Sequence, residues 1–278
     1  MLSPKEFIKS YSKTGAAKAQ DGTLRLFVLA VLAGFFIAIA GAATNTAAFA
    51  QESMSAVKLV CALLFPFGLL MVILSGSELF TGNCLMLISV LERTASVRGV
   101  LRNLAVVYLG NFVGAFLTAA ACAYSGQLDL DGGMLAMYTI KVAAAKCGLS
   151  FGKALLLGVL CNVLVCAAVV FASMAGSIPG KAIGAYVPVC FFVLCGFEHS
   201  IANMYYVPAG LLAAGLPQYD WVLSAVDVSG LSWGAFLLNN LLPVTLGNVI
   251  GGAGLALLLW LCHGRLIEKR EYSRASRM

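Results

Sequence analysis

Charge is scarce in this sequence. Only 11% of its 278 residues are Asp, Glu, Lys or Arg, whereas 61% are hydrophobic. A soluble domain usually carries about 25% charged residues, and a soluble fold of this length could not hide so much apolar surface. The composition therefore excludes an ordinary water-soluble protein, and we expect a lipid bilayer to surround most of the chain.

Histidine is almost absent, with only His199 and His263. A membrane redox subunit, the alternative from another protein class, normally holds haem or quinone through histidines on facing spans, and only His199 lies in a predicted span. The nine cysteines form no Cys-x-x-Cys pair, and their number is odd. They indicate neither a disulfide framework nor a zinc site, so we expect no metal, no cofactor and no enzymatic activity.

Long apolar runs are what the chain does have. A helix that spans the hydrocarbon core needs about 20 apolar residues. Runs with almost no charge cover 26–50, 59–77 continuing as 79–91, 103–126, 154–175, 182–197 continuing as 199–216, and 234–262. The sequence therefore predicts an all-α membrane protein with six transmembrane helices, of which the second and fifth are long and broken.

The distribution of Lys and Arg predicts the orientation. Most of the 18 basic residues lie before span one, after span two, after span four and in a basic tail over residues 264–278. Cytoplasmic loops carry such an excess, so we expect both termini in the cytoplasm and a multi-pass protein of the plasma membrane. The basic residues flank the spans without interleaved aromatic residues, so no nucleic-acid partner is expected.

Residues 1–24 are predicted to form a cytoplasmic amphipathic helix. Ser3, Pro4 and Glu6 have the spacing of a helix start, with a Ser cap, Pro at the first position and Glu at the third. Apolar residues then recur at helical spacing beside a separate lysine stripe, as in helices that lie on a membrane surface. The helix is either a topology anchor or a gate over the cytoplasmic mouth.

One short pattern occurs twice, each time inside an apolar span: SGSELFTGN at residues 75–83 and CGFEHSIAN at residues 195–203. A carboxylate inside a membrane needs an internal partner or a water-filled cavity, and glycine beside it indicates an interrupted helix. Matched interruptions in two halves point to a transport site near the bilayer midplane. The residues predicted to build the two breaks are Gly76, Glu78 and Asn83 in the first and Gly196, Glu198 and Asn203 in the second.

A second repeated pattern, L-G-N-x-x-G, occurs at residues 109–114 and 246–251. Each half therefore has three spans, with the broken helix in the middle. Because three is odd, the halves enter the membrane from opposite sides, which predicts an inverted repeat. We expect a channel domain over 25–263, with repeat A at 25–126 and repeat B at 152–263, joined by an outer loop at 127–153.

Several side chains near the breaks could carry chemistry. His199 follows Glu198 directly and could donate a hydrogen bond or a proton to a permeating anion; otherwise its hydrogen bonds are purely structural. Thr81 is its natural partner across the pseudo-twofold axis, or else a cap of the broken helix. Glu78 and Glu198 are expected to accept from freed backbone N–H groups rather than line the path as free charges.

Two other features flank the predicted path. Lys146 lies on the outer side before span four, where it could raise the local anion concentration or snorkel to the interface. Leu79 and Phe80 in the first break and Phe192 beside the second could form an apolar gate, or they are ordinary core contacts.

The motifs SGSELFTGN, LCNVLVC, GFEHSIANM and NNLLPVTLGN resemble the signatures of the formate/nitrite transporter family. The resemblance covers nearly the whole chain. It implies a homopentamer of aquaporin-like protomers, each with its own pore for formate, nitrite, hydrosulfide or related small monovalent anions. It also implies that the amino-terminal helix gates the cytoplasmic mouth.

The resemblance also assigns roles to residues. His199 matches the central pore histidine, Thr81 the threonine of the loop that breaks span two, and Lys146 the vestibule lysine. Polar positions near the histidine are matched by Asn162, Glu198 and Asn240. The two hydrophobic constrictions are matched by Phe65, Leu69, Val165 and Phe192, while Leu79 and Phe80 belong to the same loop as Thr81 and complete the predicted constriction residues.

We therefore expect a proton-linked channel for small anions of weak acids, with formate as the first choice and nitrite or hydrosulfide as alternatives. A water or small-solute channel is a more distant alternative, considered because such channels have a similar inverted-repeat fold. Its expected Asn-Pro-Ala repeats are absent from both breaks.

Overall fold

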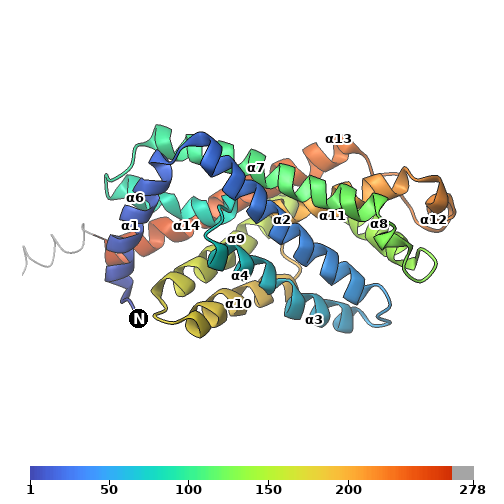
Figure 1. Cartoon of the computed structure of the whole chain (residues 1–278), viewed down its shortest axis with the longest axis horizontal. Helices are drawn as coiled ribbons and strands as arrows, with labels where there is room; N and C mark the ends of the chain where they lie inside the picture. The colour runs from blue at the N-terminus through green and yellow to red at the C-terminus, as the bar shows by residue number, and fades with distance from the viewer. Residues whose placement is uncertain (265–278) are drawn as a thin grey trace, which may run out of the picture.

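The computed structural model describes residues 1–264, and every regular element in that range is a helix (Figure 1). The predicted basic tail lies outside the described residues except for Gly264. The helices, in chain order, are α1 (Pro4–Gln20), α2 (Thr23–Ala48), α3 (Met54–Leu64), α4 (Pro66–Ser75), α5 (Phe80–Asn83), α6 (Leu87–Leu91), α7 (Val97–Tyr124), α8 (Met134–Cys147), α9 (Phe151–Met174), α10 (Ile178–Leu194), α11 (Ser200–Ala214), α12 (Asp220–Ala225), α13 (Trp233–Ala235) and α14 (Leu242–His263). A π-helical segment, Phe236–Leu241, joins α13 to α14.

The predicted all-α membrane architecture is confirmed. Five helical stretches are long and apolar enough to cross a membrane: Thr23–Ala48, Met54–Ser75, Val97–Tyr124, Phe151–Met174 and Trp233–His263. The sixth crossing is shared by α10 and α11 on either side of a break. The first half of the chain has the same kind of break between α4 and α5.

The two halves pack in the same way. In the first half α2 lies along α7, and in the second α9 lies along α14. The last glycine of each L-G-N-x-x-G pattern explains the close approach: a Cβ on Gly114 would overlap the Val31 carbonyl oxygen, and one on Gly251 would overlap that of Val159. Small residues at such positions allow helix backbones to touch in a membrane.

Helix α1 begins as predicted. The Ser3 hydroxyl accepts from the Glu6 N–H at 3.3 Å, while the Glu6 carboxylate accepts from the Ser3 N–H at 2.7 Å. These Ser3 donors, the backbone N–H first, lower the pKa of the Glu6 carboxyl. The apolar residues of α1, Phe7, Ile8 and Tyr11, are buried in a cluster with residues of α6, α9 and α14. The apolar face of α1 therefore packs on the channel body, where we had expected contact with the membrane surface.

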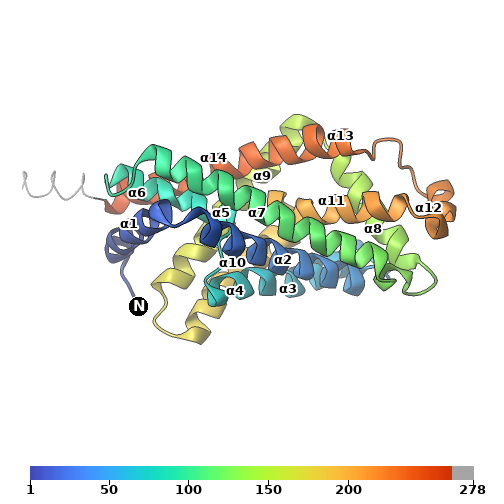
Figure 2. The same cartoon turned by 45° about the horizontal axis from the view of Figure 1, so that its top comes forward.

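Helix α8 corrects the prediction of a loop over residues 127–153. Leu135, Ala136, Ile140 and Ala143 are buried along one face, and this helix packs against α11. Lysines among its apolar residues kept the segment from resembling a span. Figures 1 and 2 both show α1 at one end of the molecule and α8 at the opposite end. A short helix thus precedes the first span of each repeat.

The second span has an interruption that the sequence analysis did not predict. Helix α3 ends at Leu64 and α4 begins at Pro66. Pro66 has no N–H to donate to the Ala62 carbonyl, so the backbone hydrogen bonds of the helix are interrupted at this turn. The Tyr186 hydroxyl of α10 donates to the Leu63 carbonyl at 2.7 Å, which connects the two broken spans at this point.

Replacement of this hydroxyl should weaken the contact between α3 and α10. We expect Tyr186→Phe to destabilise the protein by about 0.6 to 2 kcal/mol, the range for hydrogen bonds between membrane helices. The thermal unfolding midpoint of purified protein measures the effect. Tyr124→Phe is the matched control, because Tyr124 is 65% exposed at the end of α7. Equal midpoints for both variants would contradict a stabilising role of the Tyr186 hydroxyl.

Candidate functional site

Both predicted helix breaks are confirmed, and each turns on a glycine. Helix α4 is capped by Gly76 at φ 68°, and Gly196 follows α10 at φ 72°. Residues other than glycine rarely adopt this left-handed backbone conformation, because their Cβ atom clashes with the backbone. The chain then runs extended through Leu79 and His199 before α5 and α11 begin.

Asn111 of α7 satisfies the backbone of the first break. Its side-chain oxygen accepts from the Phe80 N–H at 2.9 Å. Its amide nitrogen donates to the Glu78 carbonyl at 2.9 Å and to the Ala30 carbonyl at 2.7 Å. One carboxamide therefore binds the break to the first span of the same repeat.

Asn248 of α14 does the same for the second break. Its oxygen accepts from the Ser200 N–H at 2.9 Å, and its nitrogen donates to the carbonyls of Glu198 at 3.0 Å and Gly158 at 2.8 Å. Asn111 and Asn248 are the asparagines of the repeated L-G-N pattern. The sequence analysis used that pattern only for topology and missed this role.

The Glu198 carboxylate faces Lys146 of α8. The Lys146 ammonium donates to both carboxylate oxygens, at 2.8 and 3.0 Å. Asn203 donates to the same carboxylate at 2.7 Å, and Asn240 donates to it at 3.4 Å and to the Lys146 carbonyl at 3.1 Å. Lys146 is therefore held in an ion pair, and Glu198 is only 7% exposed.

The Glu78 carboxylate has the equivalent partners in the first half. Lys18 of α1 lies 3.0 Å from it, and Asn83 donates to it at 2.7 Å. Asn83 also donates to Asn103, whose amide donates to the Lys18 carbonyl at 3.1 Å. The sequence analysis missed Lys18 and Asn103. The signal was present, because Ala-Ala-Lys occurs at both 16–18 and 144–146.

These contacts correct one expectation. Glu78 and Glu198 were expected to accept from backbone N–H groups of the breaks. In the structure their carboxylates accept from lysine and asparagine side chains, while Asn111 and Asn248 bind the backbone. A carboxylate in apolar surroundings is stabilised far more by a cation than by an amide dipole, which accounts for the difference.

Thr81 and His199 meet where the two breaks approach each other. The Thr81 hydroxyl oxygen lies 2.9 Å from His199 Nε2. His199 Nδ1 accepts from the Ala202 N–H at 3.1 Å, which makes the imidazole the cap of α11. Because Nδ1 is an acceptor, the neutral ring carries its hydrogen on Nε2, which donates to Thr81.

Asn162 and Cys166 of α9 hold the other side of Thr81. The Asn162 amide donates to the Thr81 carbonyl at 3.1 Å and to the Asn248 carbonyl at 2.6 Å. The Cys166 thiol donates to the same Thr81 carbonyl at 3.4 Å. Asn162 thus connects the two breaks through the backbone beside the Thr81–His199 contact.

Apolar side chains surround this contact. The Phe192 ring stacks on His199 with 5.9 Å between centroids, and Phe65 meets Phe192 edge-on at 5.8 Å. Phe80 instead packs edge-on against Tyr108 of α7 at 4.8 Å. The six predicted constriction residues belong to one buried cluster, and none is more than 6% exposed: Phe65, Leu69, Leu79, Phe80, Val165 and Phe192.

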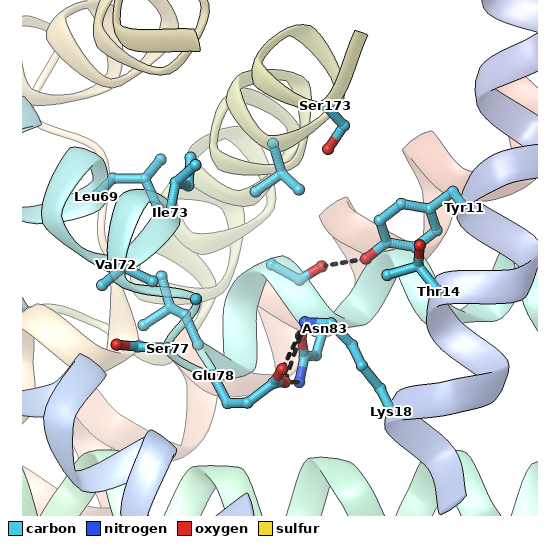
Figure 3. Close-up of a pocket in the computed structure, with 14 residues that line it drawn as sticks. Tyr11, Thr14, Lys18, Leu69, Val72, Ile73, Ser77, Glu78, Asn83 and Ser173 are labelled. Carbon is cyan, nitrogen blue, oxygen red and sulfur yellow. Dashed lines mark hydrogen bonds and ion pairs between the residues drawn. The ribbon is translucent and has the colours of Figure 1, made fainter. Parts of the chain in front are cut away.

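A pocket of 220 Å³ lies at the end of the molecule that carries α1. Figure 3 shows Lys18, Glu78 and Asn83 meeting along its wall, with Leu69 and Val72 of α4 at the side. The Tyr11 hydroxyl donates to the Gly82 carbonyl at 3.4 Å. Helix α1 therefore forms part of the pocket wall, in the position that a gate would need; gating by residues 1–24 stays a prediction.

The ion pair at Glu198 makes a prediction about stability. Lys146→Met leaves the carboxylate buried without its cation, so we expect a loss of about 3 to 5 kcal/mol and a lower thermal unfolding midpoint. Adding Glu198→Gln in the same chain should recover much of the loss, because the orphaned charge is gone. Lys141→Met, at an exposed position of the same helix, serves as control. A Lys146→Met midpoint equal to that of the control would show that the pair is not needed.

Comparison with known proteins agrees with this geometry. Residues 5–262 match the family model described as "Formate/nitrite transporter". The probable formate transporter of Methanothermobacter thermautotrophicus is 36% identical, over 93% of this chain and 96% of its own length. The formate channel FocA of Haemophilus influenzae is 36% identical over 91% of both chains, and FocA of Escherichia coli K12 is 33% identical over 95% of both.

Solved structures show the same fold. A pentameric formate channel with formate bound superposes with a TM-score of 0.77 at 33% identity, covering 87% of this chain and 97% of that one. An ion channel of the same family gives a TM-score of 0.79 at 26% identity, covering 92% and 98%. The chain therefore belongs to the formate/nitrite transporter family, and it is a multi-pass membrane channel protein rather than an enzyme.

Proposed function

We propose that the protein is a proton-linked channel for small monovalent anions of weak acids, with formate as its substrate. The observation that carries this proposal is the Thr81–His199 contact. It places two hydrogen-bonding side chains at the meeting point of the two breaks, inside an apolar cluster and between two Lys–Glu pairs. The names of the formate channels similar to this chain support formate as the substrate.

The channel is proposed to act in the plasma membrane as a homopentamer, with a pore in each protomer and both termini in the cytoplasm. The pentameric formate channel of similar fold supports this assembly. The Lys and Arg distribution supports the orientation. On this orientation Lys146 faces the outer vestibule and Lys18 the cytoplasmic one.

The lysines concentrate the anion at the two mouths. Each ammonium has three N–H donors. Lys146 uses two of them on the Glu198 oxygens, which leaves one for an anion. Glu198 cancels much of the positive charge, so the vestibule attracts an anion without holding it too tightly to leave.

Between the vestibules the anion must cross the apolar cluster. A bare charge there is costly, and Thr81 and His199 reduce that cost. A proton added at Nδ1 would displace the Ala202 N–H and break the α11 cap. A hydrogen shared through Nε2 keeps the cap intact. The anion therefore accepts from the His199 Nε2–H and the Thr81 hydroxyl. The proton that neutralises it comes from the water of the vestibule, the imidazole keeps its Nε2 hydrogen, and the anion crosses as nearly neutral acid.

Flux into proteoliposomes tests the substrate. We expect formate to enter faster than nitrite or hydrosulfide, and faster at pH 5 than at pH 7, because protons convert more of the anion to its acid form. Stopped-flow rates measured side by side for the three anions provide the comparison. Selective flux of nitrite or hydrosulfide would show that this anion, and not formate, is the substrate. Rates no higher than those of empty liposomes would refute the channel itself.

His199→Phe tests the proton link. The variant keeps an aromatic ring beside Phe192 but has no Nε2 hydrogen, so formate flux should lose its increase at low pH. The measurement is the ratio of initial rates at pH 5 and pH 7. His263→Phe, at the end of α14, should retain the wild-type ratio. If His199→Phe retains it as well, proton sharing by His199 is wrong.

A further inference from the structure

Lys58 of α3 breaks the internal symmetry of the two helix breaks. Its ammonium nitrogen rests on Gly196, only 2.5 Å from where a Cβ on that glycine would lie. At Gly76, the matching glycine of the first break, nothing lies within 4 Å of the corresponding point. The lysines of the ion pairs are matched between repeats, as Lys18 and Lys146. Lys58 is an additional cation at one break.

Lys58 is also unpaired. Its side chain is partly buried, yet no hydrogen bond or ion pair joins its ammonium to any other residue in the range 1–264. Glu198, the carboxylate of that break, is bound by Lys146. An ammonium is a strongly hydrated point charge, so half-burial without a partner leaves its donors to water or to an exchangeable anion.

The position of Lys58 in α3 places it on the path to the constriction. Phe65, the residue that caps the C-terminal end of α3, lies seven residues after Lys58. Seven residues make about two helical turns, so the two positions lie on one side of this segment, about 10 Å apart along its axis. The Phe65 ring contacts Phe192, which stacks on His199. Lys58 thus precedes, on the same face, the aromatic residues that enclose the Thr81–His199 contact.

Lys146 is a second cation near the same aromatic group. Its ammonium lies 5.3 Å from the centre of the Tyr206 ring, and Tyr206 stacks on Phe65 at 6.5 Å. Lys58 beside Gly196 and Lys146 over Tyr206 are therefore two cations near this aromatic group. Of the two, only Lys146 is paired with a carboxylate, so the excess positive charge belongs to Lys58.

We propose that Lys58 is the capture residue for the anion at the outer vestibule. Its ammonium N–H groups bind the small carboxylate before the anion passes Phe65 and Phe192. Gly196 makes room for the ammonium because it has no side chain. This inference rests on the proposed function. It assigns the first contact with the anion to Lys58, because Lys146 already donates to the Glu198 carboxylate and has fewer N–H groups left for the anion.

A purely structural role for Lys58 makes a different prediction. A cation at the C-terminal end of α10 would stabilise that helix through its dipole. In that case, loss of the Lys58 charge would lower the stability of the protein and the maximal transport rate without changing the affinity for the anion. Capture by Lys58 would instead stabilise the bound anion and the transition state of transport by the same free energy. Its loss raises KM and leaves kcat unchanged.

Initial rates of formate influx into right-side-out membrane vesicles separate these roles. We expect Lys58→Gln to raise KM about tenfold, the effect of losing one charge-assisted hydrogen bond, with kcat unchanged and a weaker dependence of KM on salt. Lys58→Arg should retain most of the affinity, and Lys141→Gln should behave as wild type. An unchanged KM for Lys58→Gln, or a loss confined to kcat and thermal stability, would overturn the proposal.

The wild-type protein separates failure of this inference from failure of the proposed function. If the wild type transports nitrite or hydrosulfide instead of formate, the substrate assignment fails, and the same KM comparison is made with that anion. A thermal-shift titration of purified protein with formate provides a measurement that does not need transport. Lys58→Gln should need about tenfold more formate than wild type for the same stabilisation. Identical titration curves would overturn capture by Lys58.

Discussion

A helix that stops inside a membrane must have its freed N–H and C=O groups satisfied within the protein, and the whole site depends on how this chain meets that demand. Asn111 and Asn248 each bind one N–H and one C=O of a break and a carbonyl of a neighbouring span. With the backbone held, the residues of the breaks are free to present Thr81 and His199 toward each other.

The charged residues of the breaks must likewise find their partners within the protein. Each break carries a carboxylate, and each carboxylate receives a lysine from the short helix that precedes its repeat: Lys18 from α1 and Lys146 from α8. The entrance helices are therefore attached to the centre of the channel, not only to its rim. A movement of α1 would change the surroundings of Glu78, which gives a physical route from the cytoplasmic mouth to the break.

The sequence predicted features that depend on local pattern. Glycine and a carboxylate within an apolar run located both breaks. The pseudo-twofold relation of the two motifs predicted Thr81 as the partner of His199, although Thr81 falls two positions beyond the residue that aligns with it. Features that depend on distant neighbours were not predicted. Lys18 contacts Glu78 across 60 residues of chain. Helix α8 resembled a loop because lysines interrupt its apolar sequence, although Lys141 lies on the exposed side of the helix. The predicted carboxylate partners were wrong because the motif contains only the backbone of its own break and not the distant lysines.

A cryo-EM map of the assembled protein in saturating formate would test the central claim most directly. If the pore of each protomer passes between Thr81 and His199, density for the anion should lie within hydrogen-bond distance of the Thr81 hydroxyl and His199 Nε2. Density confined to a path between protomers, with the Thr81–His199 contact closed and empty, would contradict the account.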